Sequence, residues 1–189
     1  MPHPAISGHP GYFLQGERLY LREVRPEDVT ERYHRWMNDP DVTRFLECRF
    51  YPNSMEKLKE YVASRLGDRD NVLLAMVLQE EHRHIGNIKL GPIDWIHRTG
   101  DIGLLVGERD CWGQGYATEA IRVLTDYAFG TLNLMKLTAG AYDPNQGSIR
   151  AFQKAGFQIE GKRKRQYFCE GDYVDLVQMG LVRIGPASP

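Results

Sequence analysis

Apolar positions recur along the chain with two spacings, and the change from one to the other separates strands from helices. Short apolar runs that end in turn residues predict strands at 19–24, 71–78, 84–93, 101–107, 136–141, 157–168 and 173–182. Apolar residues three and four positions apart predict helices at 25–38, around 42–46, and at 54–66, 115–129 and 146–155. The order β-α-α-β-β-β-α-β-α-β-β predicts an α/β fold in which helices cover both faces of a mixed sheet.

One junction stands out, because two glycines, Gly113 and Gly115, lie between the strand at 101–107 and the helix at 115–129. Glycine allows a tight turn there and leaves the backbone N–H groups unshielded. The first N–H groups of a helix have no partner within it, and the helix dipole adds positive charge. The junction is therefore expected to bind a phosphate or a pyrophosphate.

Three glycine-rich motifs compete for this loop. A Walker A loop needs Gly-Lys-Ser/Thr after a first glycine, and no such string occurs. A dinucleotide fingerprint needs a small residue where Thr118 stands and an acidic residue about 20 positions on, where the sequence reads Leu134-Met135-Lys136. The third is the acetyl-CoA loop, Arg/Gln-x-x-Gly-x-Gly/Ala, of the GNAT acetyltransferases. Residues 112–117 resemble it, with Trp112 in place of the first Arg or Gln.

A second string supports this resemblance about 30 residues further on. The segment 145–157, with Asn145, Ser148, Lys154 and Gly156-Phe157, resembles the second GNAT motif. The resemblance covers residues 17–183 and implies the GNAT fold, with acetyl-CoA as co-substrate and no metal. It also implies that the strands at 101–107 and 136–141 splay apart around the pantetheine arm of acetyl-CoA. The cofactor-binding residues that it implies are Leu105, Val106, Trp112, Gly113, Gln114, Gly115, Tyr116, Ala117, Thr118, Asn145, Ser148 and Lys154.

Acetyl transfer requires a neutral amine, donors for the oxyanion and a proton for the CoA thiolate. The resemblance implies that backbone N–H groups near Leu105 or Val106 are the oxyanion donors. Many GNAT enzymes have a proton-donating Tyr where this chain has Phe152. The substitutes are Ser148, which we take as the thiolate acid, or Tyr142 or Tyr167. The base candidates are Asp101, Asp94 and His97, which flank the strand at 101–107. The catalytic set expected from the sequence is therefore Ser148, Tyr167 and Asp101.

The resemblance implies an N-acetyltransferase, and the acceptor amine remains open. The segments 84–94 and 171–175 resemble GNAT proteins of surface-polysaccharide pathways, which favours an amino-sugar nucleotide. The loop resembles that of the ribosomal-protein branch, for which the acceptor is a protein N-terminus. Polyamines would need an acidic cluster, and none is evident on the acceptor side. A GNAT fold that binds acyl-CoA without catalysis is the third alternative. A homodimer is common in the family.

Composition narrows the picture further. The 189 residues carry a net charge of −1, which favours neither nucleic acid nor an anionic membrane as a partner. No apolar run reaches the roughly 18 residues of a membrane span. Three scattered cysteines indicate reduced thiols and a cytoplasmic protein. We expect a flexible lead-in at 1–16, one catalytic domain at 17–183 and a tail at 184–189.

Three features have ordinary interpretations. His82 and His84 have the spacing of a ligand pair on one strand face, but no third metal ligand lies near them in the sequence. The basic run 162–165 is interpreted as a solvated strand, on which Arg163 and Arg165 share a face and could hold an anionic substrate. Glu119 is interpreted as a favourable charge in the first turn of a helix.

Overall fold

The computed structural model describes residues 11–184. Its strands are β1 (Leu14–Gln15), β2 (Leu19–Glu23), β3 (Val72–Leu78), β4 (His84–Asp94), β5 (Thr99–Val106), β6 (Lys136–Tyr142), β7 (Gln158–Cys169) and β8 (Asp172–Val182). Its α-helices are α1 (Glu31–Asn38), α2 (Pro40–Thr43), α3 (Met55–Ala63), α4 (Tyr116–Gly130) and α5 (Gln146–Lys154). Short 3-10 helices are η1 (Pro26–Asp28), η2 (Glu47–Phe50) and η3 (Arg109–Cys111). Within residues 11–184, no helix has both the length and the apolar character needed to cross a membrane.

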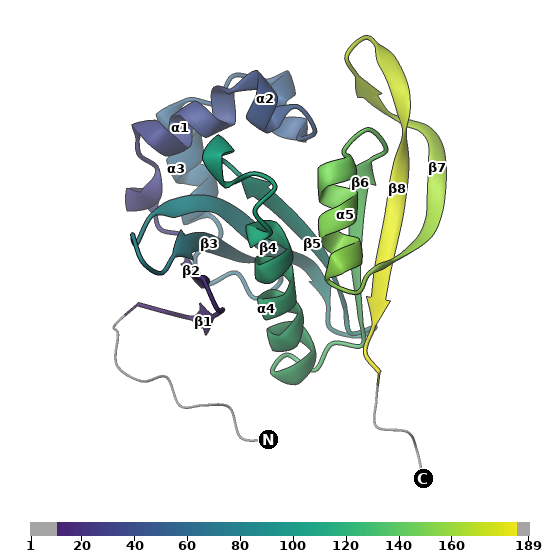
Figure 1. Cartoon of the computed structure of the whole chain (residues 1–189). Coiled ribbons are helices and arrows are strands. Elements are labelled where there is room, and N and C mark those ends of the chain that lie inside the picture. Colours follow the sequence, from purple (N-terminus) through teal and green to yellow (C-terminus); the bar gives the residue numbers. More distant parts are fainter. Residues whose placement is uncertain (1–10, 185–189) are drawn as a thin grey trace.

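The strands form one mixed sheet in the order β1-β2-β3-β4-β5-β6-β8-β7 (Figure 1). β5 and β6 are parallel, but they pair only from Thr99 and Lys136 to Asp101 and Thr138. Beyond these residues β5 stays paired with β4 as far as Val106, while β6 stays paired with β8. The inner edges of β5 and β6 therefore separate, which confirms the splayed strands that the family resemblance implied.

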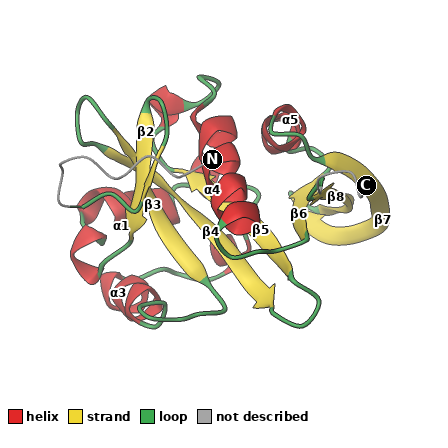
Figure 2. Cartoon of the chain, turned by 90° about the horizontal axis from the view of Figure 1, so that it is seen from below, coloured by secondary structure: helices red, strands yellow, loops and turns green. Residues whose placement is uncertain are grey.

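Two apolar clusters hold the helices against the two faces of the sheet. On one face, α4 and α5 pack with alternate residues of β4, β5, β6 and β8. On the other face, α1, α2 and α3 pack against β2 and β3. Figure 2 shows α1 and α3 on the opposite side of the sheet from α4. Because side chains alternate along a strand, Leu104 and Val106 face the α4 side, and Leu105 faces the α1 side.

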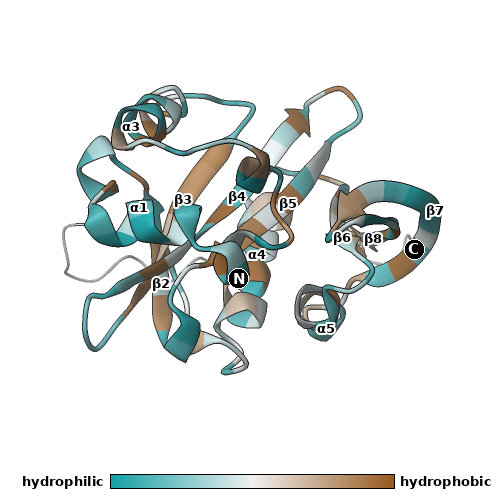
Figure 3. Ribbon diagram, turned by 90° about the horizontal axis from the view of Figure 1, so that it is seen from above, coloured by the Kyte–Doolittle hydropathy of each residue, from teal (hydrophilic) through white to brown (hydrophobic). Residues whose placement is uncertain are grey.

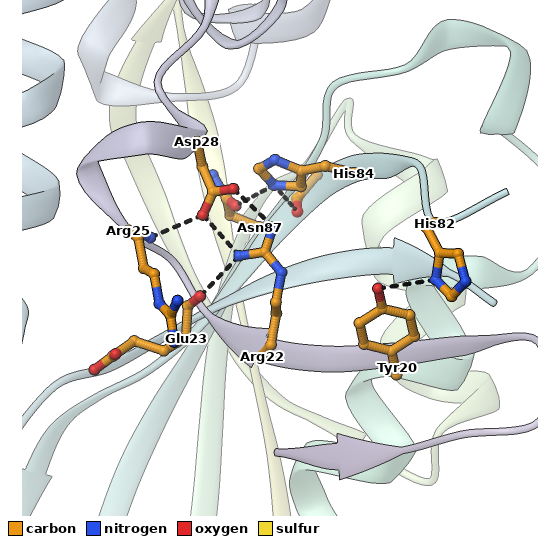
Figure 4. Close-up of polar contacts among 9 residues, drawn as sticks. Tyr20, Arg22, Glu23, Arg25, Asp28, His82, His84 and Asn87 are labelled. Atoms are coloured by element: carbon orange, nitrogen blue, oxygen red, sulfur yellow. Dashed lines mark hydrogen bonds and ion pairs between the residues drawn. The ribbon is translucent and has the colours of Figure 1, made fainter. Parts of the chain in front are cut away.

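Polar contacts hold η1 against β2, and the buried His84 makes a second set of contacts on β4 (Figure 4). The guanidinium of Arg22 donates to both carboxylate oxygens of Asp28 at 2.7 Å. Nε2 of His84 lies 2.8 Å from Asn87 Oδ1 and 2.9 Å from Gly86 O, so it is the donor. Burial lowers the pKa of His84, so its ring stays neutral near neutral pH.

His82 and His84, which have the spacing of a metal-ligand pair, make separate contacts. His82 lies in the turn before β4 and contacts the hydroxyl of Tyr20 at 3.3 Å, while His84 is buried. No group of three potential metal ligands occurs among residues 11–184.

Two predicted elements differ from those observed. Residues 14–15, placed in the lead-in, form β1 and pair with Leu21 and Tyr20 of β2, while residues 1–10 lie outside the described residues. The helix expected at 25–38 is divided into η1 and α1. Asp28 accepts a hydrogen bond from the Arg25 N–H, and Thr30 is extended, with a ψ of 175°. Of the tail expected at 184–189, Ile184 follows the end of β8, and residues 185–189 lie outside the described part.

The basic run lies on β7, which is an edge strand and is largely hydrophilic (Figure 3). The register shifts between Arg163 and Tyr167, and Arg165 has a φ of 49°, so regular alternation is interrupted. Arg165 pairs with Asp172 at 3.1 Å, whereas the partner of Arg163 is the amide oxygen of Gln178. The regular alternation from which the Arg163/Arg165 pair was predicted is therefore absent at this point of β7, and the two arginines have different partners.

Candidate active site

A pocket of about 510 Å³ opens where β5 and β6 separate, beside the N-terminus of α4. Its walls come from the α2 segment, the end of β5, the loop before α4, the first turn of α4, and one side of α5. The lining residues are Asp41, Val42, Phe45, Leu46, Leu104, Leu105, Val106, Cys111, Trp112, Gly113, Gly115, Tyr116, Ala117, Thr118, Asn145, Gly147, Ser148, Arg150, Ala151 and Lys154.

The glycine loop has the backbone of an anion cradle. Gly115 caps α4 with φ 87° and ψ 0°, and Gly113 has a φ of 74°, both left-handed conformations that favour glycine. Among residues 11–184, the N–H groups of Gly113, Gly115 and Tyr116 have no hydrogen-bond acceptor. These N–H groups and the helix dipole fit a pyrophosphate.

The end of β5 offers peptide groups to the gap. Gly107 N–H donates to Ile85 O on β4 at 2.8 Å. Because peptide groups alternate along a strand, those of Leu105 also face β4, and those of Leu104 and Val106 face the gap. A Cβ on Gly86 would collide with Leu105 O, in agreement with that direction. An extended arm in the gap could therefore pair with Leu104 and Val106, whereas Leu105 would contribute its side chain.

Trp112 and Gln114 shape the loop in different ways. The indole Nε1 of Trp112 donates to Val106 O at 2.8 Å, so this side chain holds the loop against the end of β5. Gln114, predicted to bind the cofactor, does not line the pocket. Its side chain donates to Asp110 O, and its own carbonyl accepts from Arg18 at 3.0 Å. The remaining predicted cofactor-binding residues all line the pocket.

The N-terminus of α5 forms the opposite wall. Asn145 caps the helix, because its Oδ1 accepts from the Ser148 N–H at 3.2 Å. This leaves the Asn145 amide N–H groups as donors toward the pocket. Ser148 lines the pocket with no bond to its hydroxyl among the described residues. Phe152 is 2% exposed and packs edge-on against Phe157, so it belongs to the core.

Asp101 and Tyr167 do not line this pocket. Thr138 donates to Asp101 Oδ2 at 2.7 Å across the last paired residues of β5 and β6. Burial raises the pKa of the Asp101 carboxyl, while the Thr138 hydrogen bond and the charge of Lys89 lower it. Burial also raises the pKa of Tyr167, and the Asp101 charge adds to this. By strand alternation, Asp101 shares the face of Leu105, opposite α4, and Tyr167 stacks on Tyr142. Ser148 lies on α5.

The other two base candidates are engaged elsewhere. Asp94 accepts from the backbone N–H groups of Ile96 and His97 at 2.9 and 2.8 Å in the β4–β5 turn. This turn lies at the paired end of β5, away from the pocket at the other end of that strand (Figure 1). Asp94 therefore has the role of a turn residue.

Aromatic and cationic side chains cover the α1 face of β6 and β7. The rings of Tyr142 and Tyr167 stack with centroids 4.4 Å apart. Arg49 donates to the hydroxyl of Tyr142 at 3.2 Å and to Phe168 O at 2.6 Å. We call Asp101, Tyr142, Tyr167, Arg49 and Arg163 the acceptor face. The sequence missed Arg49, because its partners are distant in the chain and no motif surrounds it.

The chain is matched over residues 18–158 by the family model for the acetyltransferase (GNAT) domain. It therefore belongs to the GNAT N-acetyltransferases, which use acetyl-CoA. The unpaired N–H groups of the loop and the gap between β5 and β6 fit this co-substrate.

Two relatives extend the match over most of the chain. The uncharacterized N-acetyltransferase p20 of Bacillus licheniformis is 27% identical, over 90% of this chain and 96% of its own length. The spermidine N(1)-acetyltransferase of Escherichia coli K12 is 28% identical, over 84% of this chain and 83% of its own length. These relatives support neither the ribosomal-protein branch nor the amino-sugar branch by name.

The fold has a solved counterpart in the spermidine N-acetyltransferase of Vibrio cholerae in complex with CoA and spermine. The TM-score is 0.79 at 24% sequence identity, and the match covers 87% of this chain and 95% of that one. This likeness concerns the fold.

Proposed function

We propose that this N-acetyltransferase acetylates the amino group of a nucleotide-linked sugar. One observation carries the proposal: the acceptor face combines a carboxylate with arginines that have no carboxylate partner among residues 11–184. Arg163 contacts only an amide oxygen, and Arg49 donates to carbonyl and hydroxyl oxygens. Such a face suits an acceptor with an ammonium at one end and a phosphate at the other.

A polyamine is the second candidate, favoured by the spermidine acetyltransferases among the relatives. A polycation needs unpaired carboxylates. On the β7–β8 hairpin, however, Glu170, Asp172 and Asp175 pair with Arg44, Arg165 and Lys164. Glu47 adds one acidic group near Tyr142 and Tyr167. The charges of this face are therefore mixed, which favours the sugar nucleotide.

The residues act in two stages in this proposal. Acetyl-CoA supplies the thioester whose acetyl carbon forms the new C–N bond as the C–S bond breaks. Asp101, whose pKa is raised by burial, takes one proton from the acceptor ammonium, which leaves a neutral amine that can attack. The nitrogen loses its second proton to solvent as the amide forms. The N–H of Val106 faces the gap and is the donor for the oxyanion. Ser148 gives its proton to the departing CoA thiolate and regains one from solvent.

The test compares acceptors and variants together. Turnover of acetyl-CoA is measured with a UDP-linked amino sugar, spermidine and an N-terminal peptide. We expect the highest kcat/KM for the sugar nucleotide. Arg163→Ala should lower that value about tenfold or more and leave the KM for acetyl-CoA unchanged. Arg165→Ala is the matched control, because Arg165 is already paired with Asp172.

Two outcomes would contradict the proposal. Spermidine could be the best acceptor, with a kcat/KM that Arg163→Ala leaves unchanged or increases. The polyamine would then be the acceptor, because removal of a cation favours a polycation. If Arg163→Ala and Arg165→Ala lowered kcat/KM equally, the acceptor would respond to the overall positive charge of this surface and not to Arg163 in particular.

A further inference from the structure

Arg18 lies behind the glycine loop, although it is distant from it in the sequence and carries no motif. It stands one residue before β2, and its side chain crosses to the start of α4. Its Nε donates to Glu119 Oε2 at 2.9 Å, and its Nη1 donates to Gln114 O at 3.0 Å. The guanidinium carbon also lies 4.5 Å from the ring centroid of Tyr116. One planar cation thus contacts the loop and the first turn of the helix.

Glu119 attaches this segment to α4 without help from the guanidinium. Its Oε1 accepts from the backbone N–H groups of Arg18 and Leu19 at 2.7 and 3.1 Å. The β1–β2 turn is also closely packed, since a Cβ on Gly16 would lie 2.7 Å from Glu119 Oε1. The charged side chain of Arg18 is therefore not needed to hold β2 in place.

The bond to Gln114 O has a geometric consequence. In a trans peptide, the C=O and the following N–H point in opposite directions. When Arg18 holds the Gln114 carbonyl outward, the N–H of Gly115 points away from Arg18. Gly115 lines the pocket, and its N–H has no acceptor among residues 11–184. Gly115 has a φ of 87° and no Cβ, so its own side restrains this peptide little, and a contact such as that of Arg18 can set its orientation.

We propose that Arg18 is a positioning residue for acetyl-CoA: it fixes the Gln114–Gly115 peptide so that the Gly115 N–H is directed at the pyrophosphate. The guanidinium acts through the peptide and does not itself contact the phosphate. A lysine cannot replace it, because one ammonium lacks the planar fork that reaches both Glu119 and Gln114.

The test measures CoA binding, so it needs no acceptor and does not depend on the acceptor proposed above. In Arg18→Ala we expect the Kd for CoA to rise about tenfold, which is ~1.4 kcal/mol. The thermal midpoint should change little, because the Glu119 bonds to the backbone remain. In NMR spectra, CoA should move the Gly115 amide proton downfield in the wild type, and this shift should be lost in the variant.

Two further variants complete the design. Arg18→Lys keeps the charge and should weaken CoA binding nearly as much as Arg18→Ala. Arg98→Ala is the control at the other end of α4, where Arg98 binds Asn133, and it should leave the Kd unchanged. If Arg18→Ala does not fold, Arg18→Lys carries the test alone.

Three results would overturn the proposal. A Kd within twofold of the wild type in Arg18→Ala would mean that the peptide is oriented without Arg18. Weaker binding with the Gly115 shift retained would place the effect elsewhere. Full rescue by Arg18→Lys would assign the effect to positive charge and not to the orientation of the peptide.

Discussion

A substitution at Gly107 would test whether the packing of α1 against the end of β5 stabilises the protein beside the active site. This residue follows β5 directly, next to the pocket-lining Val106. A Cβ there would collide with the indole ring of Trp36, which is 4% exposed. Trp36 also donates from Nε1 to Glu108 Oε1 at 2.9 Å. Gly107→Ala must therefore displace a buried ring that is tied to the neighbouring residue.

The expected cost has two parts. Overpacking a core site costs about 1–3 kcal/mol. Loss of the Trp36–Glu108 hydrogen bond adds about 0.5–1.5 kcal/mol. The free energy of unfolding should therefore fall by about 2–4 kcal/mol. For a chain of this length, that lowers the thermal midpoint by about 5–15 °C.

Chemical denaturation of matched variants checks the reasoning. Gly103→Ala is the control on the same strand, since a Cβ on Gly103 would meet nothing within 4 Å. It should stay within about 0.5 kcal/mol of the wild type. In a Trp36→Leu background, Gly107→Ala should cost at least about 1 kcal/mol less, because the ring is gone. If Gly107→Ala and Gly103→Ala unfold alike, the account of the Trp36 contact is refuted.

Three further predictions concern titratable and catalytic groups. Because burial raises the folded pKa of Asp101, its ionised form destabilises the fold at neutral pH. Asp101→Asn should therefore raise the thermal midpoint at pH 7 by about 1–3 °C, and this gain should disappear below about pH 4. The same variant should lower kcat about 100-fold, and an unchanged kcat would exclude Asp101 as the base. The folded pKa of His84 is lowered by burial, so its contribution to stability is present above about pH 6.5 and lost as the pH falls through the lowered value. His84→Gln should flatten that part of the stability–pH curve, and an unaltered slope in thermal melts would show that another group titrates. Ser148→Ala should slow turnover about tenfold or more where chemistry limits the rate, and a loss within about twofold would rule out Ser148 as the thiolate acid.

The local motifs could be predicted because they depend on neighbours in the chain. The pair Gly113 and Gly115 signals a strand-to-helix turn, and Asn145 with Ser148 signals a helix N-terminus, whatever surrounds them. Contacts between residues that are distant in the chain could not be predicted in this way. Arg18 contacts Gln114 and Glu119 about 100 residues away, and no periodicity relates such positions.

The family resemblance predicted features of the fold that the pattern of apolar residues could not. Period and turn residues predicted most strands and helices, and the resemblance supplied the splay of β5 and β6. The insertion of β8 between β6 and β7 was not predicted, because both strands of a hairpin carry the same local signal. The bulge at Arg165, with φ 49°, was missed for a similar reason. In a strand of polar residues, an extra residue does not interrupt any apolar alternation, so the sequence pattern does not indicate it.

The sequence alone determined the order of elements and the phosphate loop, because these follow from short-range spacing and backbone freedom. The acetyl-CoA class of co-substrate came from the resemblance of two sequence motifs to those of the GNAT family. Tertiary structure decided which groups meet across the gap. It placed Asp101 beside Thr138, stacked Tyr142 on Tyr167, and brought Arg49 to the hydroxyl of Tyr142 and Arg163 to Gln178 of β8. The physical reason is that charge, burial and pKa depend on neighbours in space. Strand pairing sets those neighbours only after the chain has folded.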